Sequence, residues 1–171
     1  QSSSAASDVY KRQIPYPSLL MLGPFMAPDL REAFRERVAK IDKLESLTFD
    51  SNMESLMQGA AGVVAMGGYN TFCEILTMDK PAVIAPRTKP RLEQLIRASK
   101  AQELGLVRCL PSDDTQDPAL MAQALRELPH QTRPSEVSIP GLLDGLDNID
   151  RLISKRLTKN RRERTKLALE A

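Results

Sequence analysis

Short runs of apolar residues alternate along the chain with longer stretches in which apolar positions recur every three or four residues. Unbroken short runs are typical of strands that are buried on both faces of a parallel sheet, and the longer period is that of amphipathic helices. The pattern predicts strands at 18–22, 46–49, 62–66, 81–85 and 106–109. It predicts helices at 28–40, 51–58, 70–78, 90–104 and 118–128, and a last helix from Gly145. This alternation favours an α/β fold with a doubly wound, mainly parallel, Rossmann-like sheet.

Some positions in these helices have specific expected roles. The helix at 90–104 carries a set of apolar residues that we expect to share its buried face: Leu92, Leu95, Ile96 and Leu104. Gly105 is expected to end this helix as its C′ residue. Asp50 or Ser51 is expected to cap the helix at 51–58. In a doubly wound sheet, ligands bind at the carboxyl ends of the strands, so the loops that follow the strands are the expected site.

The composition suits one globular domain with additions at its ends. The 171 residues are 42% hydrophobic, which is enough for one core, and the length is too small for two full domains. Residues 1–13 are rich in Ser and Ala without an apolar period, and we expect a disordered, non-native segment there, with the native protein starting upstream. Residues 14–144 form the expected domain, and residues 145–171 form a C-terminal helix with a basic tail.

Charge and cysteine content exclude several classes of protein. The 24 Lys and Arg residues against 22 Asp and Glu residues give a net charge of +2, without the strong basicity of a protein that coats nucleic acid. Two cysteines and a single histidine exclude a disulfide scaffold and a zinc site of the usual ligand spacing. The apolar runs fall short of the roughly 20 residues that cross a bilayer. We therefore expect a cytoplasmic protein without a metal site and without a nucleic acid partner.

The last part of the chain carries most of the charge asymmetry. From Arg151 to Ala171, eight basic residues stand against Glu163 and Glu170, a local charge of +6 that leaves −4 for the rest. Apolar residues recur at helical spacing just before and within this tail: Leu146, Ile149, Leu152, Ile153 and Leu157. Two interpretations stay open, a solvated helix end, or a peripheral docking surface for anionic lipid headgroups at the inner membrane face or for an acidic partner.

The strongest candidate for chemistry is a predicted strand that runs through Gly67 and Gly68 directly into a helix. Backbone amides at Gly67, Gly68 and Tyr69 would lie at the helix N-terminus, where the helix dipole favours a phosphate group. The composition alone is also compatible with any tight turn between a strand and a helix. Glu74 follows Thr71 by three residues, so it either completes a capping box or accepts hydrogen bonds from a ribose diol.

A second candidate is the basic loop after the fourth predicted strand. It holds Arg87, Lys89 and Arg91, which could neutralise a diphosphate, and leads to Glu93 and Gln94, which could bind hydroxyl groups. A solvent-exposed first helical turn explains the same residues. His130 lies outside both candidates, at the end of a predicted helix, and we interpret it as a surface residue.

Several of these residues occur together in a known pattern. In order along the chain, the motifs are Gly68, Thr71 and Glu74, the turn Asp79-Lys80-Pro81, Pro86, the pair Glu93-Gln94, and Gly105. The segment from Leu47 to Leu106 thereby resembles the carboxy-terminal, donor-binding domain of glycosyltransferases of the GT-B fold. It is most similar to the family of the N-acetylglucosaminyltransferase that forms lipid II, and to predicted glycosyltransferases with a GGYNT motif.

The resemblance implies a role for each matching residue. Glu74 falls where the family holds the ribose hydroxyls of a UDP-type donor, and Gly67, Gly68, Tyr69, Asn70 and Thr71 fall where its diphosphate rests. Glu93 and Gln94 fall where the donor sugar is bound. Phe49, with Met53 nearby, falls where the base is enclosed. Arg87 replaces an aromatic or apolar residue of the lipid II enzyme, and a diphosphate contact suits its chemistry.

The resemblance also implies the activity and its limits. It implies transfer of a sugar from a nucleotide-diphosphate sugar, without metal or cofactor, to a hydroxyl acceptor held by an amino-terminal domain that supplies the catalytic base. That domain and a glycine-rich loop after the domain's first strand are missing from this sequence, so we expect an incomplete sheet, no catalytic residue in this fragment, and no activity of the fragment alone. Two alternatives stay open. One is a non-catalytic nucleotide-sugar or partner-binding module, and the other is a nucleotide-sugar epimerase, which would need further carboxylates and a histidine.

Overall fold

The computed structural model describes residues 14–48, 52–111, 117–137, 139–142 and 144–169, with the side chains of the last helix described up to Thr158. The chain divides into two compact units, Gln1–Val137 and Ser138–Ala171. Phe49, Asp50, Ser51 and the first thirteen residues, for which the sequence makes predictions, lie outside the described residues.

The first unit alternates strands and helices as the sequence pattern predicts. Its elements follow in the order β1 (Ser18–Met21), α2 (Pro28–Val38), β2 (Leu44–Leu47), α3 (Met53–Gly59), β3 (Val63–Ala65), α4 (Tyr69–Thr77), β4 (Ala82–Ile84), α5 (Glu93–Glu103), β5 (Arg108–Cys109), α6 (Pro118–Glu127) and the short 3-10 helices η2 (Leu128–His130) and η3 (Pro134–Glu136). All strand pairs within the described residues are parallel. The predicted α/β fold with parallel strands is therefore confirmed.

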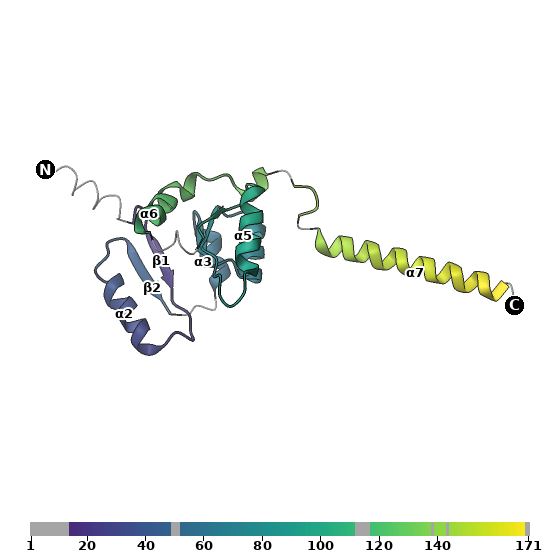
Figure 1. Cartoon of the computed structure of the whole chain (residues 1–171), viewed down its shortest axis with the longest axis horizontal. Helices are drawn as coiled ribbons and strands as arrows, with labels where there is room; N and C mark the ends of the chain where they lie inside the picture. The colour runs from purple at the N-terminus through teal and green to yellow at the C-terminus, as the bar shows by residue number, and fades with distance from the viewer. Residues whose placement is uncertain (1–13, 49–51, 112–116, 138, 143, 170–171) are drawn as a thin grey trace. The chain divides into compact units, whose positions relative to one another are not determined.

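The strands form two sheets. β1 pairs with β2, with Ser18 opposite Leu44, and β3, β4 and β5 pair in that order. Figure 1 shows β1 and β2 side by side, with α2 next to β2. β4 has a strand on each side and is fully buried, whereas Leu19 of β1 and Val64 of β3 are 41% and 43% exposed. Because β1 and β3 each have one neighbouring strand among the described residues, they keep apolar surface that the sequence pattern predicts to be buried.

The core of the first unit lies around β4. Val83 and Ile84 of β4 are completely buried. Val83 belongs to a cluster with Leu110, Ala124 and Leu128 from the segments that follow. Leu128 also approaches Gly62 so closely that a Cβ atom on Gly62 would lie 2.6 Å from Leu128 Cγ. This contact fixes the start of β3, the strand that leads into the glycine pair.

Most strand and helix boundaries differ from the predicted ones by one to three residues. The second strand begins at Leu44 rather than 46 because Lys43, with φ of +63°, turns the chain immediately before it. α3 begins at Met53 with Asn52 as its N-cap, so the predicted cap at Asp50 or Ser51 is wrong. α5 begins at Glu93 rather than 90, and the N–H of Ile96 donates to the Leu92 carbonyl at 2.9 Å in its first turn.

The predicted apolar face of α5 is buried only in part. Leu95 is half-buried, and Ala98 and Ala101 are buried, whereas Leu92, Ile96 and Leu104 are 54%, 62% and 47% exposed. The small alanine side chains let the helix backbone approach β5, against which α5 packs. The predicted end of this helix is confirmed, because Gly105 adopts φ of +75° and the N–H of Leu106 donates to the Ala101 carbonyl at 2.9 Å.

The second unit consists mainly of α7 (Gly145–Leu169), which begins at the predicted residue. Among the described residues, no helix combines the length and the apolar character needed to cross a bilayer.

Candidate functional site

The carboxyl ends of β3 and β4 lie next to each other. Ala65 is opposite Ile84 in the parallel ladder, and the N–H of Ala85 donates to the Ala65 carbonyl at 2.8 Å. The loop with Gly67 and the loop with Arg87 therefore leave the sheet side by side, at the strand ends where parallel sheets bind their ligands.

The glycine pair allows a tight turn from β3 into α4. Gly67 is buried with φ of +74°, and a Cβ atom there would lie 2.7 Å from Ile84 Cγ2. Gly68 is the N-cap of α4 and provides no side chain to cap it. The first backbone amides of a helix have no carbonyl partner within the helix, so those of Tyr69, Asn70 and Thr71 are directed out of its N-terminus. A helix end of this kind attracts an anion.

The structure rejects local capping as the explanation of Glu74. A capping box would make Thr71 the N-cap, but α4 begins two residues earlier and Thr71 lies within its first turn. Glu74 is four residues after Asn70, so both lie on one side of α4, away from the buried face of Phe72 and Ile75. The half-buried Glu74 carboxylate makes no hydrogen bond or ion pair with another described residue. It is thus available to a ligand beside the helix N-terminus.

Arg97 of α5 joins the two loops. Its Nη1 donates to the Gly67 carbonyl at 2.8 Å, and its Nη2 donates to Glu93 Oε1 at 3.2 Å. The guanidinium carbon also lies 5.5 Å from the centroid of the Tyr69 ring. One largely buried cation, 22% exposed, therefore brings together Gly67, Tyr69 and Glu93, three residues that the sequence predicts for the site.

The sequence analysis did not select Arg97. Its one signal in the sequence is the position four residues after Glu93, which fits a routine ion pair along a helix. The contact with the Gly67 carbonyl joins residues 30 positions apart, and no local pattern announces it.

Gln94 has a structural partner in the other loop. Its Oε1 accepts a hydrogen bond from the backbone N–H of Arg87 at 3.0 Å, which ties the loop after β4 to the first turn of α5. The Arg87 side chain itself is exposed. The structure thus places Arg87 and Gln94 together, while Phe49, the predicted neighbour of the base, lies outside the described residues.

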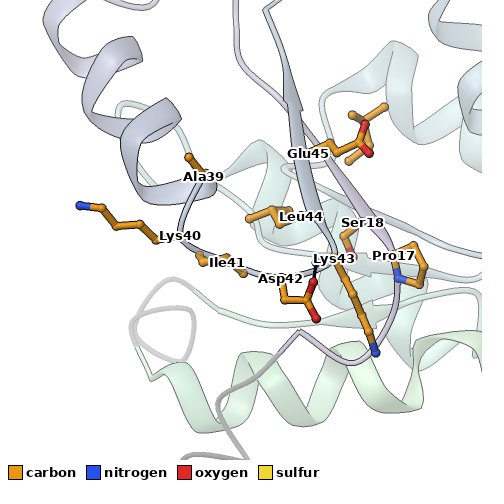
Figure 2. A pocket seen from close by; sticks show the side chains of 10 residues that line it. Pro17, Ser18, Ala39, Lys40, Ile41, Asp42, Lys43, Leu44 and Glu45 are labelled. Atoms are coloured by element: carbon orange, nitrogen blue, oxygen red, sulfur yellow. Dashed lines mark hydrogen bonds between the residues drawn. The ribbon is translucent and has the colours of Figure 1, made fainter.

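A separate hollow of about 680 Å³ lies at the amino ends of β1 and β2 (Figure 2). The turn between α2 and β2, at residues 39–43, lines it together with Pro17 and Ser18. In Figure 2 the side chains of Lys40 and Lys43 point away from each other, so they do not converge on one anion. None of the predicted site residues lines this hollow.

Among the described residues, two carboxylates outside the candidate site have clearly shifted pKa values. Asp79, just after α4, has a lowered pKa, chiefly because the backbone N–H of Ser135 donates to its Oδ1 at 2.7 Å. The pKa of Glu127 is lowered mainly by a hydrogen bond from Gln123. Within the described residues, no group of three His, Cys, Asp or Glu side chains is placed to hold a metal ion.

Comparison with solved structures finds glycosyltransferases with low sequence identity. The glycosyltransferase VinC, in a complex with DTDP, is 21% identical, with a TM-score of 0.49, over 70% of this chain and 35% of that one. The calicheamicin glycosyltransferase CalG4 is 20% identical, with a TM-score of 0.47, over 68% of this chain and 36% of that one. The glycotransferase of kitacinnamycin is 18% identical, with a TM-score of 0.46, over 71% of this chain and 37% of that one. This chain thus spans little more than a third of each of these three proteins.

A comparison with curated proteins gave no match. The model of the glycosyltransferase family 28 C-terminal domain, in contrast, matches residues 26–140, which is more than half of the chain and includes both loops of the candidate site. Together with the parallel α/β fold, this match confirms the resemblance to GT-B enzymes, and the chain belongs to glycosyltransferase family 28, of which it carries the C-terminal domain.

Proposed function

We propose that this domain binds a nucleotide-diphosphate sugar, most simply of the UDP type, as the donor half of a cytoplasmic enzyme that transfers the sugar to a hydroxyl acceptor. The observation that carries the proposal is the N-terminus of α4, which follows Gly67 and Gly68 and has no side-chain cap. In a family 28 domain, an anion site at this position is best explained by a donor diphosphate.

In this proposal the diphosphate rests on the amides of Tyr69, Asn70 and Thr71. The exposed guanidinium of Arg87, from the adjacent loop, supplies a positive charge toward it. The same groups would stabilise the charge that develops on the diphosphate when the bond to the sugar breaks. Arg97 acts as a positioning residue, because it binds the Gly67 carbonyl rather than standing in the path of the phosphates.

The remaining predicted residues would recognise the two sugars and the base. The Glu74 carboxylate can accept two hydrogen bonds from a ribose diol. Glu93 and Gln94 each use one oxygen within the protein, toward Arg97 and the Arg87 amide, and keep Glu93 Oε2 and Gln94 Nε2 for hydroxyls of the donor sugar. Phe49 remains the residue proposed to enclose the base.

The proposed transfer needs more than this domain. The proposal assigns no catalytic base to the chain, and an acceptor-binding domain would provide both the base and the acceptor, so the chain alone is expected to bind donor without transferring sugar. His130, which an epimerase interpretation would require near the sugar, is exposed and belongs to η2, outside the two loops of the candidate site. A non-catalytic binding module would bind the same donor. It can be distinguished from the proposed enzyme only by whether sugar is transferred once the domain is joined to an acceptor domain.

Calorimetric titration of the full chain with UDP, GDP and ADP tests donor binding directly. We expect saturable binding of one of these nucleotides, and a loss of at least about tenfold in affinity in Glu74→Gln, since hydrogen bonds to a charged acceptor contribute about 1.5–3 kcal/mol. Glu36→Gln, an exposed carboxylate on α2, is the matched control and should bind like the parent chain. Equal affinity of the two variants would remove Glu74 from the site, and absence of binding by the folded chain would contradict the proposal.

A further inference from the structure

Arg97 of α5 contacts three residues that belong to different parts of the candidate site. Its Nη1 donates to the Gly67 carbonyl at 2.8 Å, its Nη2 donates to Glu93 Oε1 at 3.2 Å, and its Cζ lies 5.5 Å from the centroid of the Tyr69 ring. The guanidinium is planar and rigid, so its two terminal nitrogens do not move independently. The positions of the Gly67 carbonyl and the Glu93 carboxylate are therefore linked through one group.

The hydrogen bond to Gly67 orients a backbone amide of the turn. The peptide between Gly67 and Gly68 is trans, and in a planar trans peptide the C=O and the N–H point in opposite directions. Because Arg97 holds the Gly67 carbonyl, the N–H of Gly68 is directed away from Arg97. This N–H donates to no other described residue and stays available to an anion. Arg97 thus shapes the turn that the proposed function assigns to the diphosphate.

The contact with Glu93 restrains a side chain in the first turn of α5. Arg97 is the one partner of the Glu93 carboxylate among the described residues. A glutamate that is not held loses rotamer freedom when it binds a ligand, and restraint before binding lowers this entropic cost. Arg97 therefore prepares Glu93 Oε2, the oxygen that it leaves free, for a hydroxyl of the donor sugar.

We propose that Arg97 couples recognition of the donor sugar to recognition of the diphosphate, and thereby lets the domain distinguish an intact nucleotide sugar from the free nucleotide that remains after transfer. This inference rests on the proposed function, because it assigns the two contacts of Arg97 to two parts of the same donor. A free nucleotide uses only the contact with Gly67. An intact donor uses both contacts, so its affinity depends more strongly on Arg97.

A purely structural role of Arg97 predicts a different result. An ion pair between residues four apart on a helix is common, and Arg97 could do no more than hold α5 against the turn. Loss of Arg97 would then distort the site as a whole and weaken UDP and UDP-sugars by the same factor. The ratio of the two affinities separates these roles, because a common loss cancels in it.

Calorimetric titration of the full chain with UDP, UDP-glucose and UDP-N-acetylglucosamine measures this ratio. Glu93→Gln should leave the affinity for UDP unchanged and weaken the tighter of the two UDP-sugars about fivefold, because a charged acceptor becomes a neutral one. Arg97→Gln should weaken UDP about fivefold and the same UDP-sugar about 25-fold. Lys100→Gln, which removes a cation paired with Glu103 on the same helix, is the matched control and should bind like the parent chain.

Two further variants make the test specific. In Arg97→Gln/Glu93→Gln the ratio should fall no further than in Arg97→Gln alone, because the two residues act on the sugar as one unit. Arg97→Lys keeps the charge without the planar pair of nitrogens. A lysine that donates to the buried Gly67 carbonyl should keep the affinity for UDP and lower the ratio as Glu93→Gln does. This variant also provides the test if Arg97→Gln does not fold.

Two results would overturn the proposal. The first is an unchanged ratio in the Arg97 variants, or effects of Arg97→Gln and Glu93→Gln on the ratio that multiply in the double variant. The second is a parent chain that binds UDP but neither UDP-sugar. In both cases the nucleotide still binds, whereas absence of nucleotide binding by the folded parent contradicts the proposed function itself. If GDP or ADP binds instead of UDP, GDP-mannose or ADP-glucose replaces the UDP-sugars.

Discussion

Arg97 shows how much of the candidate site depends on one side chain. Replacement by Ala removes the hydrogen bond to the Gly67 carbonyl, the ion pair with Glu93 and the contact with the Tyr69 ring. We expect Arg97→Ala to lower the free energy of unfolding by about 2 kcal/mol, with most of the loss from the hydrogen bond to Gly67 and the cation-π contact. Urea unfolding followed by circular dichroism measures this change.

Glu93→Gln is the matched control for Arg97→Ala. It weakens only an ion pair whose carboxylate is 57% exposed, so the expected cost is at most about 0.5 kcal/mol. A cost equal to that of Arg97→Ala would mean that the ion pair, and not the link to the Gly67 loop, is the important contact of Arg97.

Asp79 gives a pH-dependent contribution to stability. Its ionised carboxylate accepts hydrogen bonds from the N–H of Ser135 at 2.7 Å and the Oγ of Ser135 at 2.8 Å, and its pKa in the folded chain is lowered from the usual 3.8. A lowered pKa means that the stabilisation is complete above the unfolded-state pKa and is lost as the pH falls through the folded-state value. We expect Asp79→Asn to be about 1 kcal/mol less stable than the parent at pH 7, and the difference to disappear as the pH falls below the lowered pKa of Asp79 in the folded chain.

Two features make this comparison specific to charge. Asp79 has φ of +55°, and Asn tolerates this conformation as well as Asp does, so the substitution adds no backbone strain. Ser135→Ala removes the hydroxyl donor and leaves the backbone N–H, and it should therefore keep part of the pH dependence. Urea unfolding of the three chains between pH 2 and 7 distinguishes these cases, and a constant difference between parent and Asp79→Asn would contradict the argument.

At the scale of elements, the turn from β3 into α4 is the most constrained junction of the candidate site. Gly67→Ala would place a Cβ 2.7 Å from Ile84 Cγ2 in a backbone conformation with φ of +74°. We expect a loss of about 2 kcal/mol in the free energy of unfolding, from backbone strain and from displacement of a buried side chain. Gly68→Ala is the control in the next position, where a Cβ meets no atom within 4 Å and φ is −54°, and it should cost less than about 0.5 kcal/mol.

The sequence predicts these elements better than it predicts their contacts. The order of strands and helices, the glycine that ends α5 and the start of α7 all follow from local patterns, because periodicity and backbone conformation are local properties. The buried face of α5 is predicted only in part, because the helix packs on β5 through the small residues Ala98 and Ala101 and leaves Leu92, Ile96 and Leu104 exposed. The link from Arg97 to Gly67 joins different elements, so no local pattern contains it.

At the scale of the whole molecule, the chain consists of two compact units, Gln1–Val137 and Ser138–Ala171. Shortening the chain to end at Leu142 removes α7 and the entire basic tail. The buried core residues of the described chain run from Leu22 to Leu128, within the first unit, so the free energy of unfolding of this unit should change by less than about 0.5 kcal/mol. Nucleotide affinity should stay the same in calorimetry, because the residues of the candidate site lie in the first unit. A lower unfolding free energy in the shortened chain would show that α7 stabilises the first unit.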